Sequence, residues 1–99
     1  MLVHSVFFTL KDGVSEQEKA AFINQARLLG NIETVHSMYL GTPAATPDRP
    51  VIQKNYDVAV TVLLDSLEDH DVYQVHQIHQ DFIANNSHLW ENVVIYDSD

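Results

Sequence analysis

Four side chains that can exchange protons or donate hydrogen bonds lie at or near positions that are otherwise apolar. Tyr73, His76 and His79 recur at every third residue, and His4 lies in a strongly apolar segment at the start of the chain. Histidine titrates near neutral pH, so two sheltered histidines beside a phenol can supply a general base, a general acid and a hydrogen-bond donor. Because a buried histidine is costly without a hydrogen bond, a satisfied core network is the alternative explanation.

Metal binding is a second use of clustered histidines. His76 and His79 are three residues apart, and His4 or Asp69 would complete a set of three ligands. The usual zinc-binding helix places its histidines four residues apart, with a glutamate after the first, and this pattern is missing here. The chain also has no cysteine, which excludes disulfides and thiolate ligands. We therefore expect no metal site and no cofactor.

The charge distribution argues against polyanionic partners. The formal net charge is −9, and no lysine or arginine follows Lys54, whereas nine acidic residues do. Phosphate recognition needs cations, so nucleic acid and anionic membrane surfaces are poor partners for this chain. No apolar run approaches the roughly 20 residues of a membrane span, and the start lacks the pattern of a secretion signal. We therefore expect a cytoplasmic protein.

Four segments alternate between apolar and polar residues, as β-strands do. They are residues 2–10, 32–40, 56–64 and 90–97. The segment 42–54 contains all three prolines and is predicted to be an irregular loop.

Two helices are predicted between these strands. Each begins with a capping-box pattern, and they cover residues 15–29 and 66–85. Gly30 is predicted to end the first helix in a left-handed conformation, and Phe22 should face the core from that helix.

The resulting order of elements is βαββαβ in a single domain covering residues 1–99. It predicts an α+β, ferredoxin-like fold, in which two helices cover one face of a four-stranded antiparallel sheet. The first and third strands would be central. The other sheet face would expose Val3, Phe7, Ala59 and Leu63. These residues are too apolar for water, so we expect a homodimer formed through this open face.

The second helix would bring the reactive side chains together. At about 100° per residue, His79 falls in the middle of the apolar arc, His76 at its border and Tyr73 beyond it, at a pocket mouth. This helix should lie over the first strand, so His4 and His79 are predicted to approach each other.

The remaining histidines, His36, His70 and His88, are predicted to be ordinary surface or loop residues.

The walls of such a pocket would be mostly apolar. Val6 and Phe8 share the most apolar face of the first strand, and Phe22 would face them from the first helix. Trp90 begins the last strand, where packing is its simplest role. Together with His76, we expect these residues to contact a small hydrophobic ligand.

The sequence resembles a known family, the stress-responsive α/β-barrel or "Dabb" domain. The similar segments are the opening His4-Ser-Val-Phe-Phe-Thr-Leu-Lys-Asp-Gly-Val-Ser, then Tyr56-Asp57-Val-Ala-Val, Tyr73-x-x-His76-x-x-His79 and the closing Val-Ile-Tyr-Asp97. The resemblance covers nearly the whole chain except residues 42–54.

This resemblance implies a ferredoxin-like protomer, a homodimer whose two sheets form a barrel, and a cavity between sheet and helices. Most members of the family have no assigned reaction. One plant branch catalyses cofactor-free polyketide cyclisation with residues that match His79, Tyr73 and His4 here. By analogy His79 would abstract a proton beside a carbonyl, Tyr73 would support the enolate, and His4 would orient the substrate.

Two departures from the family pattern affect this analogy. The family usually has proline where this chain has Gln77, so the second helix is predicted to run straight through this position. Val58 stands where the cyclases carry a further histidine. Two other functions stay open: a non-enzymatic stress or assembly protein in which His4 and His79 are structural, and a cofactor-free monooxygenase like those of a neighbouring family with this fold.

Overall fold

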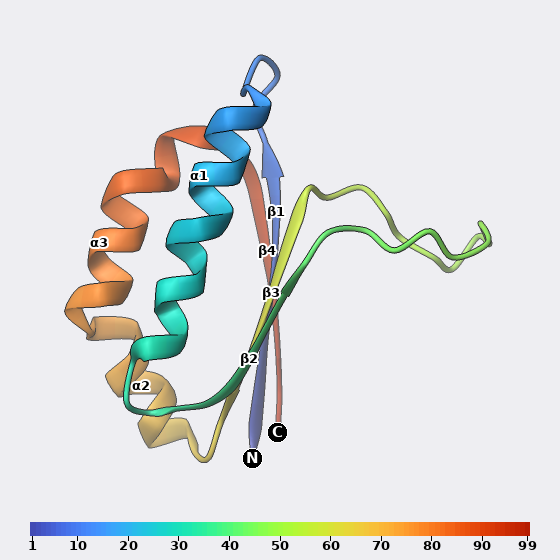
Figure 1. Ribbon diagram of the computed structural model, residues 1–99. Coiled ribbons are helices and arrows are strands. Elements are labelled where there is room, and N and C mark those ends of the chain that lie inside the picture. The colour runs from blue at the N-terminus through green and yellow to red at the C-terminus, as the bar shows by residue number, and fades with distance from the viewer.

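A computed structural model describes residues 1–99 and has the predicted α+β architecture, with a helical layer against one face of a sheet (Figure 1). The elements are β1 (Leu2–Leu10), α1 (Glu16–Arg27), β2 (Val35–Gly41), β3 (Val58–Leu64), α2 (Leu67–Val75), α3 (Gln77–Asn86) and β4 (Trp90–Ser98). Short 3₁₀ turns, Leu28–Asn31 and Ser87–Leu89, follow α1 and α3. No helix combines the length and hydrophobicity that crossing a membrane requires.

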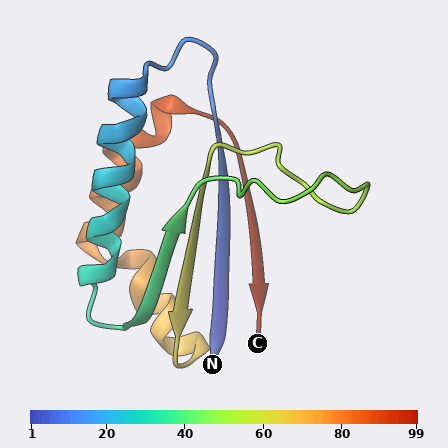
Figure 2. The same ribbon diagram turned by 45° about the vertical axis from the view of Figure 1, so that its right-hand side comes forward.

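The sheet is antiparallel and has the strand order β2-β3-β1-β4, so β1 and β3 are central as predicted (Figure 2). In this register His4 lies opposite Val62 on β3 and opposite Asp97 on β4. Side chains of directly paired residues project from the same face of a sheet. The side chains of His4 and Asp97 therefore both project toward the helices.

Burial of the side chains alternates regularly along the whole of β1 and β3. Their even-numbered residues are buried beneath the helices, and their odd-numbered residues are half-buried on the open face. Phe22 and Ala26 of α1, with Leu29 after it, complete the buried core. The aromatic side chains Phe8, Phe22, Phe82 and Trp90 pack together in this core.

The prediction of one continuous helix over residues 66–85 is wrong. The segment forms two helices, α2 and α3, with a break at His76, whose φ of −63° and ψ of 143° are those of extended backbone. The break changes which residues face the sheet. One straight helix would place Val72 and Val75 on the same apolar arc as His79, but they are 44% and 68% exposed.

The break is stabilised by hydrogen bonds to carbonyls at the end of α2. The backbone amide of His76 donates to the carbonyl of Tyr73, the His79 ring to that of Gln74 and the Gln80 side chain to that of Val75. The ring of His76 then accepts from the Ile78 amide and caps α3. These bonds satisfy groups that a helix end leaves without partners, so no proline is needed.

Replacing Gln77 with proline is expected to preserve the fold and to change stability by no more than about 1 kcal/mol in either direction. Gln77 is the first residue of α3, where proline lacks only an amide that the helix does not use. His76 already has the extended conformation that a following proline requires. Proline also removes the bond from the Gln77 side chain to Asp81, which is exposed.

Urea unfolding followed by circular dichroism measures this change. Proline at Ala84, inside α3, is the matched control and should cost about 3 kcal/mol or more. A comparable loss at Gln77 would contradict a natural helix boundary at this position.

Two smaller predictions about boundaries are also wrong. Gly30 is not left-handed; Gly13 alone has a positive φ, and α1 ends instead in the 3₁₀ turn Leu28–Asn31. The second strand begins at Val35 rather than at residue 32, because Ile32 is used in the core beneath this turn.

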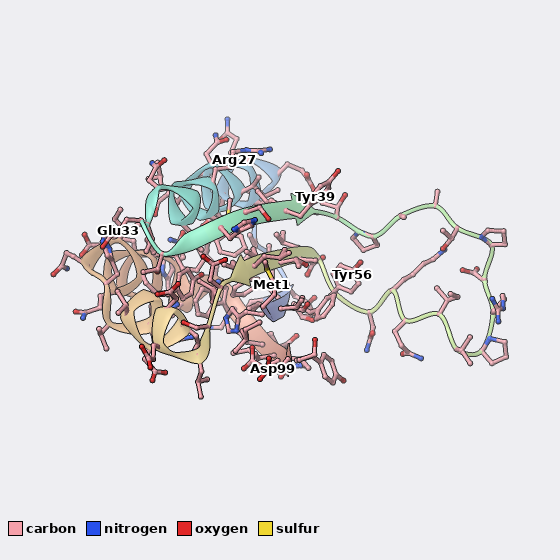
Figure 3. The ribbon with its side chains drawn as sticks, turned by 90° about the horizontal axis from the view of Figure 1, so that it is seen from below. Met1, Arg27, Glu33, Tyr39, Tyr56 and Asp99 are labelled. Atoms are coloured by element: carbon pink, nitrogen blue, oxygen red, sulfur yellow. The ribbon has the colours of Figure 1, made fainter.

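Residues 42–57 form a long arm that contains neither helix nor strand. The arm projects from the side of the sheet opposite the helices (Figure 1), and most of its residues are exposed (Figure 3). Lys54 ties its two halves together by donating to the carbonyl of Thr46 and to Asp48. The predicted irregular loop, residues 42–54, lies within this arm.

Candidate functional site

A cavity of about 120 Å³ lies between the sheet and the helices α2 and α3. Its walls are largely apolar, and its polar lining residues are His4, Tyr73, Gln74 and His79. The lining also includes Val6, Phe8, Leu29, Val60, Phe82, Ile83, Trp90, Val93 and Ile95. Small-ligand sites are typically apolar with a few convergent polar groups, and this cavity has that composition.

A larger hollow, of about 420 Å³, lies on the open face between β1, β4 and the base of the arm. Its lining contains phenols, amides and apolar groups, but no histidine and no carboxylate. The larger hollow therefore lacks a group that titrates near neutral pH. For this reason the smaller cavity is the candidate site for acid–base chemistry.

His79 has the geometry of a neutral base. It is 9% exposed, and its Nδ1 lies 3.1 Å from the carbonyl oxygen of Gln74. A carbonyl oxygen can only accept, so Nδ1 carries the proton and Nε2 keeps a free lone pair. Burial, followed by the nearby His4 and His70, lowers the pKa of His79 below its ordinary value. The ring is therefore held in the form that can take up a proton.

Tyr73 is buried rather than placed at the pocket mouth, because the break at His76 turns α2 toward the sheet. It is 2% exposed, and its ring centroid lies 4.8 Å from that of His79 and 5.8 Å from that of His4. Burial raises the pKa of the Tyr73 phenol well above its ordinary value. The phenol consequently stays protonated and can serve as a hydrogen-bond donor, not as a base.

His4 is fixed by Asp97. The ring is 2% exposed, and its Nδ1 donates to Oδ1 of Asp97 across a distance of 2.5 Å. Because the two residues are paired in the sheet register, the strands themselves set this geometry. A carboxylate on one ring nitrogen determines the tautomer and leaves the other nitrogen available.

Of the predicted lining residues, Val6, Phe8 and Trp90 line the cavity, whereas Phe22 and His76 do not. Phe22 is 1% exposed and forms part of the packed aromatic core behind the cavity wall. His76 lies at the helix break, where its ring bonds Ile78 and Glu33 instead. His76 and His79 consequently do not share a helix face, and the metal set considered for them is not assembled.

The sequence analysis missed His70, which was predicted to be an ordinary surface residue. Its side chain is 17% exposed, and its ring centroid lies 5.2 Å from that of His4. The only sequence signal is that His70 precedes Tyr73 by three residues, so both belong to one helix face. That face could not be placed against the sheet until the break at His76 was known.

Comparison with known structures places the fold in a defined class, the ferredoxin-like α+β proteins. The At3g17210 protein of Arabidopsis thaliana has 21% identity and a TM-score of 0.83, over 100% of this chain and 94% of that chain. A dimeric ferredoxin-like protein of unknown function from Thermobifida fusca has 22% identity and a TM-score of 0.80, over 98% and 88%. The hydroxynitrile lyase of Passiflora edulis has 20% identity and a TM-score of 0.81, over 98% and 90%.

The sequence itself assigns the family. The family model described as the stress responsive A/B barrel domain, Dabb, matches residues 2–99. The chain therefore belongs to the Dabb family, as the resemblance predicted. A search of curated proteins gave no match.

Proposed function

We propose that this protein binds a small aromatic or hydrophobic carbonyl compound in the cavity under α2 and α3 and transfers a proton at the carbon beside the carbonyl. One observation carries the proposal: His79 is held with Nδ1 protonated by the carbonyl of Gln74, and its Nε2 has no hydrogen-bond partner in the protein. His79 and Tyr73 line the same largely apolar cavity.

The proposed reaction uses each group once. Nε2 of His79 would take the proton from the carbon, and the enolate oxygen would accept a hydrogen bond from Tyr73. His4, held by Asp97, would orient the substrate. The cavity volume is on the order of that of an apolar cavity of roughly 150 Å³ that is known to hold benzene, so a single ring is the expected ligand size.

The hydroxynitrile lyase of Passiflora edulis supports this class of chemistry by analogy. Cleavage of a hydroxynitrile also requires a base, since the hydroxyl proton must leave as the carbonyl forms. A sheltered imidazole beside a phenol is suited to either proton transfer.

We also propose that the protein is a homodimer formed through the open sheet face. Relatives of the same fold from Thermobifida fusca and Bacteroides fragilis are described as dimeric. Here the open face presents Phe7, which contacts Tyr56 and Tyr96, and Tyr96 is 67% exposed. A second copy would cover this apolar surface, and the arm projects on the same side (Figure 1).

An NMR titration of the six histidine rings tests the site. Nitrogen shifts of His79 should show the proton on Nδ1, with a titration midpoint below the usual value of about 6.5, because burial disfavours the charged ring. Addition of acetophenone should shift the His79 ring and the Tyr73 ring signals, while the exposed His36 and His88 signals stay in place.

Absence of any ligand shift at His79, across a panel of aryl ketones, hydroxynitriles and phenols, would argue against the proposal. The hydrogen bonds of His4 and His79 would then support the second candidate, a non-enzymatic protein in which both rings complete the core. Oxygen uptake with a phenol from the panel would instead indicate a monooxygenase.

A further inference from the structure

A cluster of metal-ligating groups shares His4 and Asp97 with the candidate site and adds His70, which the proposed proton transfer does not use. It contains His4 from β1, His70 from α2 and Asp97 from β4. Each residue places one ligating atom within 4.8 Å of those of the other two. We propose that these three residues form a binding site for a divalent first-row transition metal such as Zn²⁺.

The composition of the cluster fits such an ion. Two imidazole nitrogens and one carboxylate oxygen are common ligands of zinc and of non-haem iron, and three protein ligands leave a position for water or substrate. Magnesium and calcium prefer oxygen ligands, so they fit this cluster poorly. The net charge of −9 further favours binding of a cation.

Only a small closure is needed to coordinate an ion. Tetrahedral ligands at about 2.1 Å from the metal lie about 3.4 Å apart, so the widest pair must close by at most about 1.4 Å. His4 and Asp97 are already fixed opposite each other in the sheet. Their ligating atoms, 2.5 Å apart, must separate by about 0.9 Å, and the closure falls on His70, which lies on the more exposed helix α2.

The present partners of His70 are weak enough to be exchanged. Its Nδ1 donates to Asp71 and its Nε2 accepts from Gln74, each at 3.3 Å, which is longer than an ordinary hydrogen bond of about 2.9 Å. Both partners belong to the same helix. A partly buried imidazole with two long local hydrogen bonds can turn to a stronger ligand without breaking a hydrogen bond to another element.

Binding should release protons. The proton now shared between His4 Nδ1 and Asp97 must leave if both atoms ligate the ion, since a nitrogen ligand binds in its unprotonated form. Affinity is therefore expected to fall as the pH is lowered. The side chain of Asp97 is 43% exposed, which gives the ion access from solvent.

Calorimetric titration of the untagged, metal-free protein with Zn²⁺ tests the site. The wild-type chain should bind one ion with micromolar or tighter affinity, and His70→Gln should weaken this binding at least about 10-fold, because loss of even a hydrogen-bond partner of a ligand costs about 10–100-fold. Asp97→Asn, which keeps the shape of the side chain, should have the same effect.

Two controls distinguish this site from other histidine–acid pairs and from the proposed catalytic base. His36→Gln removes the exposed pair of His36 with Asp65, and His79→Gln removes the base; both variants should bind Zn²⁺ with wild-type affinity. Absence of zinc binding, or equal affinity in the wild-type and His70→Gln chains, would overturn the proposal. The His79 ring should still respond to acetophenone in His70→Gln, so either proposal can fail alone.

Discussion

Replacing His79 with glutamine is expected to lower the rate of proton transfer by about 10²–10⁴-fold, the usual contribution of a general base. The reaction can be followed as deuterium exchange into the methyl group of acetophenone, a slow process at neutral pH without a catalyst. Glutamine fills a similar volume and can still donate to the carbonyl of Gln74, so the fold and the melting temperature should be nearly unchanged.

The pH dependence of the same reaction gives an independent check. The base acts in its neutral form, and the pKa of His79 is lowered by burial. The wild-type rate should therefore stay constant as the pH falls through about 6.5, the usual value for histidine, and decline only below the lowered pKa. A decline centred at 6.5 or above would point to a solvent-exposed histidine as the base.

His36→Gln provides the matched control for this substitution. It removes an imidazole that also pairs with a partner, Asp65, but is exposed and does not line the cavity. Its exchange rate should equal that of the wild-type chain. If instead His79→Gln destabilised the protein strongly and left the exchange rate unchanged, His79 would be a structural residue.

The second large effect is expected on assembly. Replacing Phe7 with aspartate places a carboxylate in the middle of the open face of β1. Burying an unpaired charge costs about 3–5 kcal/mol, and a symmetric interface would bury two of them. The dimer dissociation constant should therefore rise by more than about 100-fold, since each 1.4 kcal/mol is a factor of ten.

Sedimentation velocity at micromolar concentration measures this change, with circular dichroism to verify the fold. Leu67→Asp is the control, because Leu67 is a 64% exposed apolar residue at the start of α2, where an acid is tolerated. It should remain dimeric. A wild-type monomer, or a Phe7→Asp chain that stays dimeric, would contradict an interface on the open face.

The sheet could be predicted from the sequence because its signal is local. Alternation in residues 2–10 and 56–64 predicts which side chains face the helices, and the structure buries this set except for Tyr56, which precedes β3 and contacts Phe7 on the open face. The capping box at Ser15 is also formed in both directions. An alternation with a period of two residues can be recognised in a strand without knowing which elements pack against it.

The candidate site was less predictable because it depends on a break with no strong local signal. A straight helix placed Tyr73 at the pocket mouth, yet the bend at His76 buries it and moves Val75 to the surface. Glutamine at position 77 gives no indication of this bend. The break is stabilised by side chains that reach carbonyls five residues earlier, and these bonds are visible only in three dimensions.

The arm at residues 42–57 is a place where a protease should divide the chain into two fragments. Trypsin does not cut before proline, so Lys54 is its one target in the arm, and a cut there separates β1, α1 and β2 from β3, α2, α3 and β4. Because β1 pairs with both β3 and β4, the two fragments share an extensive strand ladder. The pieces should therefore reassemble as a split protein, with His4 supplied by one half and His70, Tyr73, His79 and Asp97 by the other.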